Sequence, residues 1–150
     1  MSVLRKEPDI EDIAIALHAS APLVDMPIKE LLDVETQTYT REIFIPAGTL
    51  VVGKQHAKPC VNIITQGKLL VKMHLEDDGK EIVVPKHGTY TFVSQEFGRK
   101  LLYVVEDTVF INVFSNVEAK HLDEVEAELV IPSEKFETYI KEKELVWHGH

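Results

Sequence analysis

The residues best suited to chemistry lie close together between two glycines, Gly48 and Gly67. His56 and Cys60, the only cysteine of the chain, stand four residues apart, and Lys54 precedes them. Imidazole and thiolate groups are ligands of zinc and related metals, and a thiolate beside a base is a nucleophile. We therefore expect any metal, nucleophile or small-molecule site to lie within residues 48–67.

The segments around this stretch are short runs of β-branched and aromatic residues. The eight runs lie at residues 42–45, 49–52, 61–65, 68–75, 81–84, 89–93, 101–105 and 109–114, with turns predicted at 66–67, 78–79 and 106–107 among others. Short strands at a spacing of roughly ten residues predict an all-β sandwich or barrel. No helical pattern separates them, which argues against parallel βαβ units.

Helices are expected only outside this β-rich part. Residues 9–18 carry apolar side chains at helical spacing, and Pro27 suits the first position of a second short helix that reaches Leu32. Near the C-terminus, Ser133 is a good N-cap for a helix with acidic residues in its first turn. The acidic residues within 118–128 are interpreted as a solvated surface.

The composition is that of a soluble globular protein. A length of 150 residues suits one domain with its own core. The formal charge of −9 argues against nucleic acid as a partner, because a phosphate-backbone binder concentrates Lys and Arg. One cysteine cannot form an intrachain disulfide, and no apolar stretch is long enough to span a bilayer. A cytoplasmic protein without a membrane partner is therefore expected.

The spacing of residues 48–67 resembles the first motif of the cupin superfamily. That motif is Gly, five residues, His, one residue, His, three or four residues, Glu, six residues and Gly. Gly48, Lys54, His56, Cys60 and Gly67 reproduce the spacing. The resemblance implies an antiparallel double-stranded β-helix, or jelly-roll barrel, at residues 41–117. Residues 1–40 would then form an N-terminal helical extension and residues 118–150 an acidic segment and a C-terminal helix, all in one globular domain. Because cupin barrels are commonly dimers, the resemblance also implies a homo-oligomer.

The metal ligands of the cupin motif are largely replaced in this chain. Lys54 stands in the slot of the first histidine and Cys60 in that of the glutamate, so His56 alone keeps a ligand. A second motif that starts at Gly88 puts Arg99, Lys100 or Leu101 in its histidine slot. A catalytic zinc or iron site normally takes three protein ligands. The resemblance therefore implies a degenerate metal site without a cofactor; a divalent metal held by His56 is kept as an alternative.

The altered slots suggest another use of the same place. If the barrel closes, Lys54, His56, Cys60 and a basic residue from Arg99 and Lys100 converge near its mouth, where they would bind a small anionic ligand. The competing structural interpretation sends the cations to solvent and leaves His56 and Cys60 to fill the core. A nucleophilic Cys60 paired with His56 is a third interpretation.

The function favoured by these observations is that of a non-enzymatic cupin-like binding or assembly protein. Residues 41–49, 106–109 and 122–124 also resemble small cupin-like proteins of phages and prophages, which implies a phage origin but no settled activity. No catalytic residue is assigned. Two alternatives stay open: a cupin that binds a small anionic ligand in the barrel mouth, and a metal-dependent cupin enzyme that uses His56.

Overall fold

The computed structural model describes residues 13–17, 24–73, 79–135, 137–139 and 141–142. The chain divides into two compact units, one made of Met1–Leu23 with Pro132–His150 and the other of Val24–Ile131. In the first unit, residues 13–17 are helical and helical turns follow Ser133, whose carbonyl oxygen accepts a hydrogen bond of 2.9 Å from the amide of Glu137. No helix among the described residues is long and apolar enough to cross a membrane.

The unit Val24–Ile131 is mostly antiparallel β-sheet. In chain order its described elements are β1 (Ile28–Asp33), β2 (Thr38–Ile45), β3 (Leu50–Val52), β4 (Gln55–His56), β5 (Cys60–Lys72), β6 (Lys80–Val83), β7 (Tyr90–Ser94), β8 (Leu101–Phe114), α2 (Leu122–Leu129) and β9 (Val130–Ile131). All of its strand pairs are antiparallel. The unit includes β1 and α2, which lie outside the range expected for the barrel. The all-β architecture expected from the sequence is confirmed.

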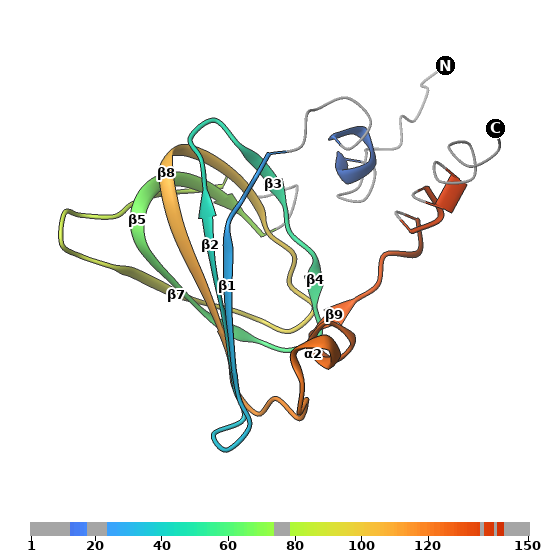
Figure 1. Cartoon of the computed structure of the whole chain (residues 1–150). Helices are drawn as coiled ribbons and strands as arrows, with labels where there is room; N and C mark the ends of the chain where they lie inside the picture. Colours follow the sequence, from blue (N-terminus) through green and yellow to red (C-terminus); the bar gives the residue numbers. More distant parts are fainter. Residues whose placement is uncertain (1–12, 18–23, 74–78, 136, 140, 143–150) are drawn as a thin grey trace. The chain divides into compact units, whose positions relative to one another are not determined.

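Two long strands, β5 and β8, run side by side and organise the sheet (Figure 1). On the far side of β8, β2 pairs with its second half and β3 with its first residues. On the far side of β5, β7 pairs with the first half and β6 with the second. β1 then extends the sheet beyond β2, and β4 pairs with β9 in a separate small sheet. The β5–β8 pair is thus shared by both halves of the sheet.

The predicted turns at residues 66–67 and 106–107 are wrong, because both lie inside long strands. The register of β5 against β8 shifts at Ile64, Gln66 and Lys68, as in a β-bulge. Gly67 there has φ 127°, a conformation that favours glycine. A bulge bends a strand without ending it, so the two strands predicted at 61–65 and 68–75 belong to one bent strand, β5.

The helix predicted from Pro27 to Leu32 is also wrong, because this segment forms β1. Ile28 to Asp33 pair with β2 along their whole length, from Ile43 to Thr38. The carbonyl oxygen of Pro27 accepts a further hydrogen bond from Phe44, at 3.0 Å. Pairing with a neighbouring strand therefore overrides the local helical signal.

The acidic segment is more than a solvated surface, because residues Leu122–Leu129 form α2. Val125 and Leu129, four residues apart on one helix face, are buried. Asp123 and Glu124 occupy the first turn, where negative charge is favourable. Asp123, Glu124 and Glu126 thus lie on the solvent side of an amphipathic helix, whereas Glu128 is partly buried.

The core consists of two clusters of buried side chains. The first is formed by Ile45, Ile64, Leu69, Val71, Ile82, Leu102, Val104 and Phe110. The second is formed by Tyr39, Cys60, Phe114, Val117, Ala119, Val125 and Leu129. The second cluster joins α2 to the inner face of β2, β5 and β8, so that the helix covers this part of the sheet.

Replacing Gly67 with alanine tests the bend of β5. A Cβ atom there would lie 2.8 Å from the Cα of Thr108, in addition to the strain of the positive φ. Gly48 has φ 82° but nothing within 4 Å of the added atom, so Gly48→Ala is a matched control. We expect Gly67→Ala to lower the free energy of unfolding by about 3 kcal/mol and Gly48→Ala by about 1 kcal/mol. Urea denaturation measures both, and equal losses would contradict a close contact at Gly67.

Candidate functional site

A row of polar side chains crosses the inner face of the sheet. Arg41 of β2 lies directly opposite Asn112 of β8, and Asn112 lies opposite Asn62 of β5. Alternate residues of a strand share a face, and the neighbours Tyr39 and Phe114 on that face are buried. We call Arg41, Asn112 and Asn62 the polar row. It places one charge and two amides where apolar residues would be expected.

The two amides of the polar row are held by hydrogen bonds. Asn112 Nδ2 donates to Asn62 Oδ1 at 2.8 Å, and Asn62 Nδ2 donates to Ser94 Oγ at 2.7 Å. The Cys60 thiol lies 3.7 Å from Asn62 Oδ1 and is 3% exposed. Cys60 is therefore a buried member of this network.

His56 lies beside the network, on the short strand β4. Its backbone N–H donates to Gly98 and its carbonyl oxygen accepts from Phe97, at 3.1 and 2.7 Å. The imidazole packs edge-on against the ring of Phe114, with centroids 5.1 Å apart. Burial lowers the pKa of His56 from 6.5 to about 4, and the positive charges of Lys100, Arg41 and Lys54 act in the same direction. The ring is neutral at pH 7.

Lys100 is a buried cation close to His56. It immediately precedes β8, its carbonyl oxygen accepts a hydrogen bond of 2.8 Å from Gly53, and the residue is 7% exposed. Its ammonium group lies 6.0 Å from the ring centroid of Phe110. Burial lowers the pKa of Lys100. Within the described part of the chain no carboxylate pairs with it, although a buried charge is costly without a partner.

Lys54 and Arg99, the other two cations predicted for the site, are engaged elsewhere. The Lys54 ammonium forms an ion pair with Glu126 of α2, in which both side chains are mostly exposed. Arg99 Nε donates to the carbonyl oxygen of Gly53 at 2.8 Å. Of the five predicted site residues, the structure thus brings together His56, Cys60 and Lys100. Lys54 lies at the exposed edge of the site, and Arg99 is hydrogen-bonded to the loop at Gly53.

A cavity of about 220 Å³ opens beside His56. Its described walls come from β1, β2, β4, β8, β9 and α2, and they include Glu30, Tyr39, Arg41, Lys54, His56, Asn112, Phe114, Asp123 and Glu126. In the described part of the chain, the guanidinium of Arg41 forms no hydrogen bond or ion pair. The prediction from the sequence missed Arg41. Arg41 could have been found from the alternation of side chains along β2, because it shares a face with Tyr39, Ile43 and Ile45, where an apolar residue is expected.

The carboxylates of this cavity are mostly in use. The Tyr39 hydroxyl donates to Glu30 Oε1 at 2.7 Å. Burial and the neighbouring Glu30 raise the pKa of Tyr39, so that its hydroxyl stays protonated and keeps donating. The hydrogen bond and the charge of Lys54 lower the pKa of Glu126. Of the described carboxylates that line the cavity, Glu30 and Glu126 thus already have partners.

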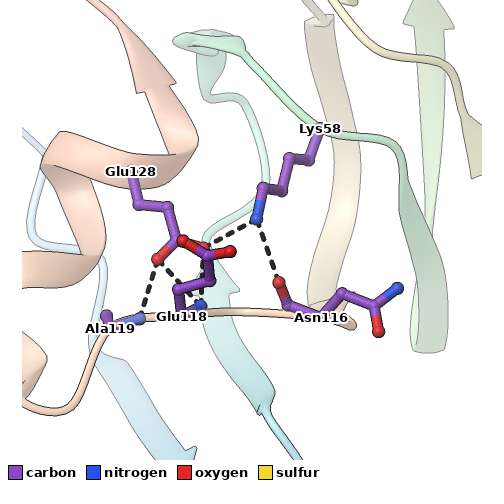
Figure 2. Close-up of polar contacts among 5 residues, drawn as sticks. All are labelled: Lys58, Asn116, Glu118, Ala119 and Glu128. Atoms are coloured by element: carbon purple, nitrogen blue, oxygen red, sulfur yellow. Dashed lines mark hydrogen bonds and ion pairs between the residues drawn. The ribbon is translucent and has the colours of Figure 1, made fainter.

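The helix wall of the cavity is fixed by Glu128 (Figure 2). Lys58 Nζ lies 2.8 Å from Glu128 Oε2 and also donates to the carbonyl oxygen of Asn116 at 3.0 Å. Glu128 accepts backbone hydrogen bonds from Glu118 and Ala119, the shortest at 2.7 Å. We call these five residues the Glu128 clamp. It ties α2 to the segment after β8 and to the loop before β5.

The surroundings of His56 do not fit a divalent metal. The positive charges of Lys100, Arg41 and Lys54 lower the pKa of His56, and the same charges repel a metal cation. The Cys60 thiol donates a hydrogen bond to Asn62 and accepts one from Asn112. Among the described residues no three His, Cys, Asp or Glu side chains are grouped to hold an ion. The donor set suits an anion better than a cation.

Glu128→Gln tests the Glu128 clamp. Burial acts to raise the pKa of Glu128, but the hydrogen bonds from Lys58, Glu118 and Ala119 outweigh it, so its pKa lies below 4.5. The stabilisation by the ionised carboxylate is then present above pH 4.5 and is lost as the pH falls through the lowered pKa. We expect the variant to be about 1–2 kcal/mol less stable at pH 7, and the difference to shrink in acid. Denaturation at several pH values measures it. Exposed Glu124→Gln is the control, and an equal loss there would refute the clamp.

The titration of His56 tests its burial. Because its folded pKa of about 4 lies below 6.5, protonation favours the unfolded chain. The stability that the neutral ring contributes above pH 6.5 is therefore lost as the pH falls toward 4. His56→Gln, which cannot titrate, should lack this loss. NMR of the imidazole carbon protons follows the pKa directly, and a midpoint near 6.5 would show that the ring is solvated.

Comparisons with known proteins find likeness in structure. No protein-family model and no curated protein matches the sequence. Among solved structures, an acetylacetone dioxygenase from Acinetobacter johnsonii is 20% identical, with 60% of this chain matched to 59% of that chain and a TM-score of 0.48. A cupin superfamily protein from Desulfitobacterium hafniense is 10% identical over 65% and 83% of the two chains, with a TM-score of 0.48. A conserved protein of unknown function from Streptococcus pyogenes is 16% identical over 66% and 90%, with a TM-score of 0.47.

The chain spans less than two thirds of the length of the dioxygenases that it matches. The matching structures include both enzymes and proteins of unknown function. At these identities the likeness concerns the fold and not the activity. The solved structures that this chain is similar to include a cupin superfamily protein and a cupin-2 domain protein.

Proposed function

We propose that this chain is a non-enzymatic binding protein that takes a small carboxylate in the cavity beside His56. The observation that carries the proposal is a pair of cations, Arg41 and Lys100, that lack a carboxylate partner among the described residues and both lower the pKa of the partly buried His56. Lys100 is buried and Arg41 is partly buried, and an unpaired charge is costly to the extent that it is removed from water. A bound anion would supply the missing partner.

The groups around the cavity suit recognition of one carboxylate. Arg41 offers the planar fork of donors that binds carboxylates through two parallel hydrogen bonds. The neutral ring of His56 offers one N–H beside it, and Lys100 adds charge from the interior. The cavity, at about 220 Å³, exceeds the ~150 Å³ that admits benzene. The cavity therefore has room for a ligand at least as large as benzene.

The acidic rim favours a ligand with a single negative charge. Glu30, Asp123 and Glu126 line the same cavity, and their charges would oppose a dianion or trianion such as phosphate or citrate. A monocarboxylate leaves its uncharged part near this rim. The expectations of a homo-oligomer, a phage origin and a cytoplasmic location remain predictions beside this proposal.

Thermal unfolding with added anions tests the proposal. We expect acetate, propionate or benzoate to raise the midpoint of unfolding, because a ligand at a hundred times its Kd stabilises the folded state by about 2.7 kcal/mol. Phosphate and citrate should stabilise less. Arg41→Gln should abolish the shift, whereas Lys29→Gln, which alters an exposed pair with Glu42 on the same sheet, should keep it. A shift that survives Arg41→Gln, or none with any monocarboxylate at millimolar concentration, would refute the proposal.

A further inference from the structure

A second cavity lies on the inner face of β5 and of its two neighbours β6 and β7. β7 pairs with residues Cys60–Ile64 of β5 and β6 with residues Lys68–Val71, and between them the strand bends at Gly67. In the described residues, β6 and β7 each pair with β5 but not with one another. The two strands therefore follow one another along the same edge of β5, one on each side of the bend.

The matching gap on the far side of β8 is closed by backbone. There the amide of Gly48 donates to Val104 at 2.7 Å, and the amide of Val104 donates to Thr49 at 2.9 Å, in the chain between β2 and β3. On the β5 side, the described hydrogen bond near the bend runs from Val84 to Gly67, at 3.0 Å. Both gaps between successive strands are thus bridged by backbone hydrogen bonds, and the free space lies on the inner face of β5, β6 and β7.

This space is a cavity of about 360 Å³, which we call the β6–β7 cavity. Its described walls are the apolar side chains of Val71, Met73, Ile82, Tyr90 and Phe92, with Gly79 and Lys80 at the margin. This volume falls within the range of small-molecule sites, about 300–1,000 Å³, and predominantly apolar walls are typical of them. It is larger than the cavity beside His56 and differs from it in chemistry.

One cation marks the margin of this cavity. Lys80 lies opposite Val71 in the register, so that it shares the inner face, and its ammonium group lies 5.0 Å from the ring centroid of Tyr90. The next residue, Glu81, pairs instead with Lys68 at 3.7 Å. No carboxylate pairs with Lys80 in the described part of the chain. The cavity therefore combines two aromatic walls, a thioether and one available positive charge.

We propose that the β6–β7 cavity is a second ligand site, which takes an aromatic molecule with one anionic group. Tyr90 and Phe92 present rings for edge-to-face or offset contacts with the ligand, and the sulfur of Met73 adds a polarisable contact. The anionic group is held by Lys80 at the margin. This site is separate from the cavity beside His56 and does not depend on it.

A matched pair of fluorescent probes tests this site. The anionic probe is 1-anilinonaphthalene-8-sulfonate and the neutral one is N-phenyl-1-naphthylamine, which differ by the sulfonate. Titration of the full chain should show one saturable site for each, with the sulfonate bound more tightly. Lys80→Met should weaken the sulfonate by about two- to fivefold, as for one partly exposed ion pair, and leave the neutral probe unchanged. Lys68→Met, on the outer face, is the control.

Filling the cavity separates this site from other apolar surfaces. Val71→Phe should weaken both probes about tenfold or more, a loss of about 1.4 kcal/mol, whereas Leu70→Phe, which puts the same ring on the outer face, should not. Where Val71→Phe does not fold by circular dichroism, the half-buried Met73→Trp takes its place. Arg41→Gln should bind both probes as the unmodified chain does. Unchanged binding in folded Val71→Phe or Met73→Trp, equal losses of both probes in Lys80→Met, or loss in Arg41→Gln would each overturn the proposal.

Discussion

The fold depends on the antiparallel pairing of β5 with β8 along their full length. Both strands are long enough to serve two halves of the sheet, and each carries a different neighbour on either half. The bend at Gly67, directly over Thr108, lets β5 pass from one half to the other without losing its partner. The two cavities follow from this arrangement. One lies against the inner face where α2 covers it, and the other lies against the inner face of β5, β6 and β7.

The interior of the sheet is divided between apolar and polar layers. Around Leu69, Val104 and Ile64 the interior is a cluster of buried apolar side chains. Toward α2 it carries the polar row, the Cys60 thiol and the cations around His56. A polar network in a low-dielectric interior is favourable only when its members have partners. The amides of Asn62 and Asn112 have theirs within the chain, whereas Arg41 and Lys100 lack theirs among the described residues.

The sequence predicts the strands well and their connections less well. Alternating β-branched runs locate the residues of β2, β3, β6 and β7, because those strands are short and bounded by turns. The turn prediction at Gly67 is wrong because a glycine with positive φ suits a turn as well as a bend within a strand. The helix prediction over β1 is wrong because the pairing of an edge strand with its neighbour leaves no signal in the strand's own sequence. His56, Cys60 and Lys100 follow from motif spacing. Arg41 does not, because its inward direction depends on the phase of β2 within the sheet.

The central place of β8 also has a consequence for how the chain folds. β2, β3 and β5 all precede β8 in the sequence, yet each of them pairs with β8. During synthesis these strands must wait with open edges until residues 101–114 emerge, and such edges are prone to wrong pairing. Contacts between segments far apart in sequence also slow the search for the native state. We therefore expect the sheet to form only after β8 has been synthesised.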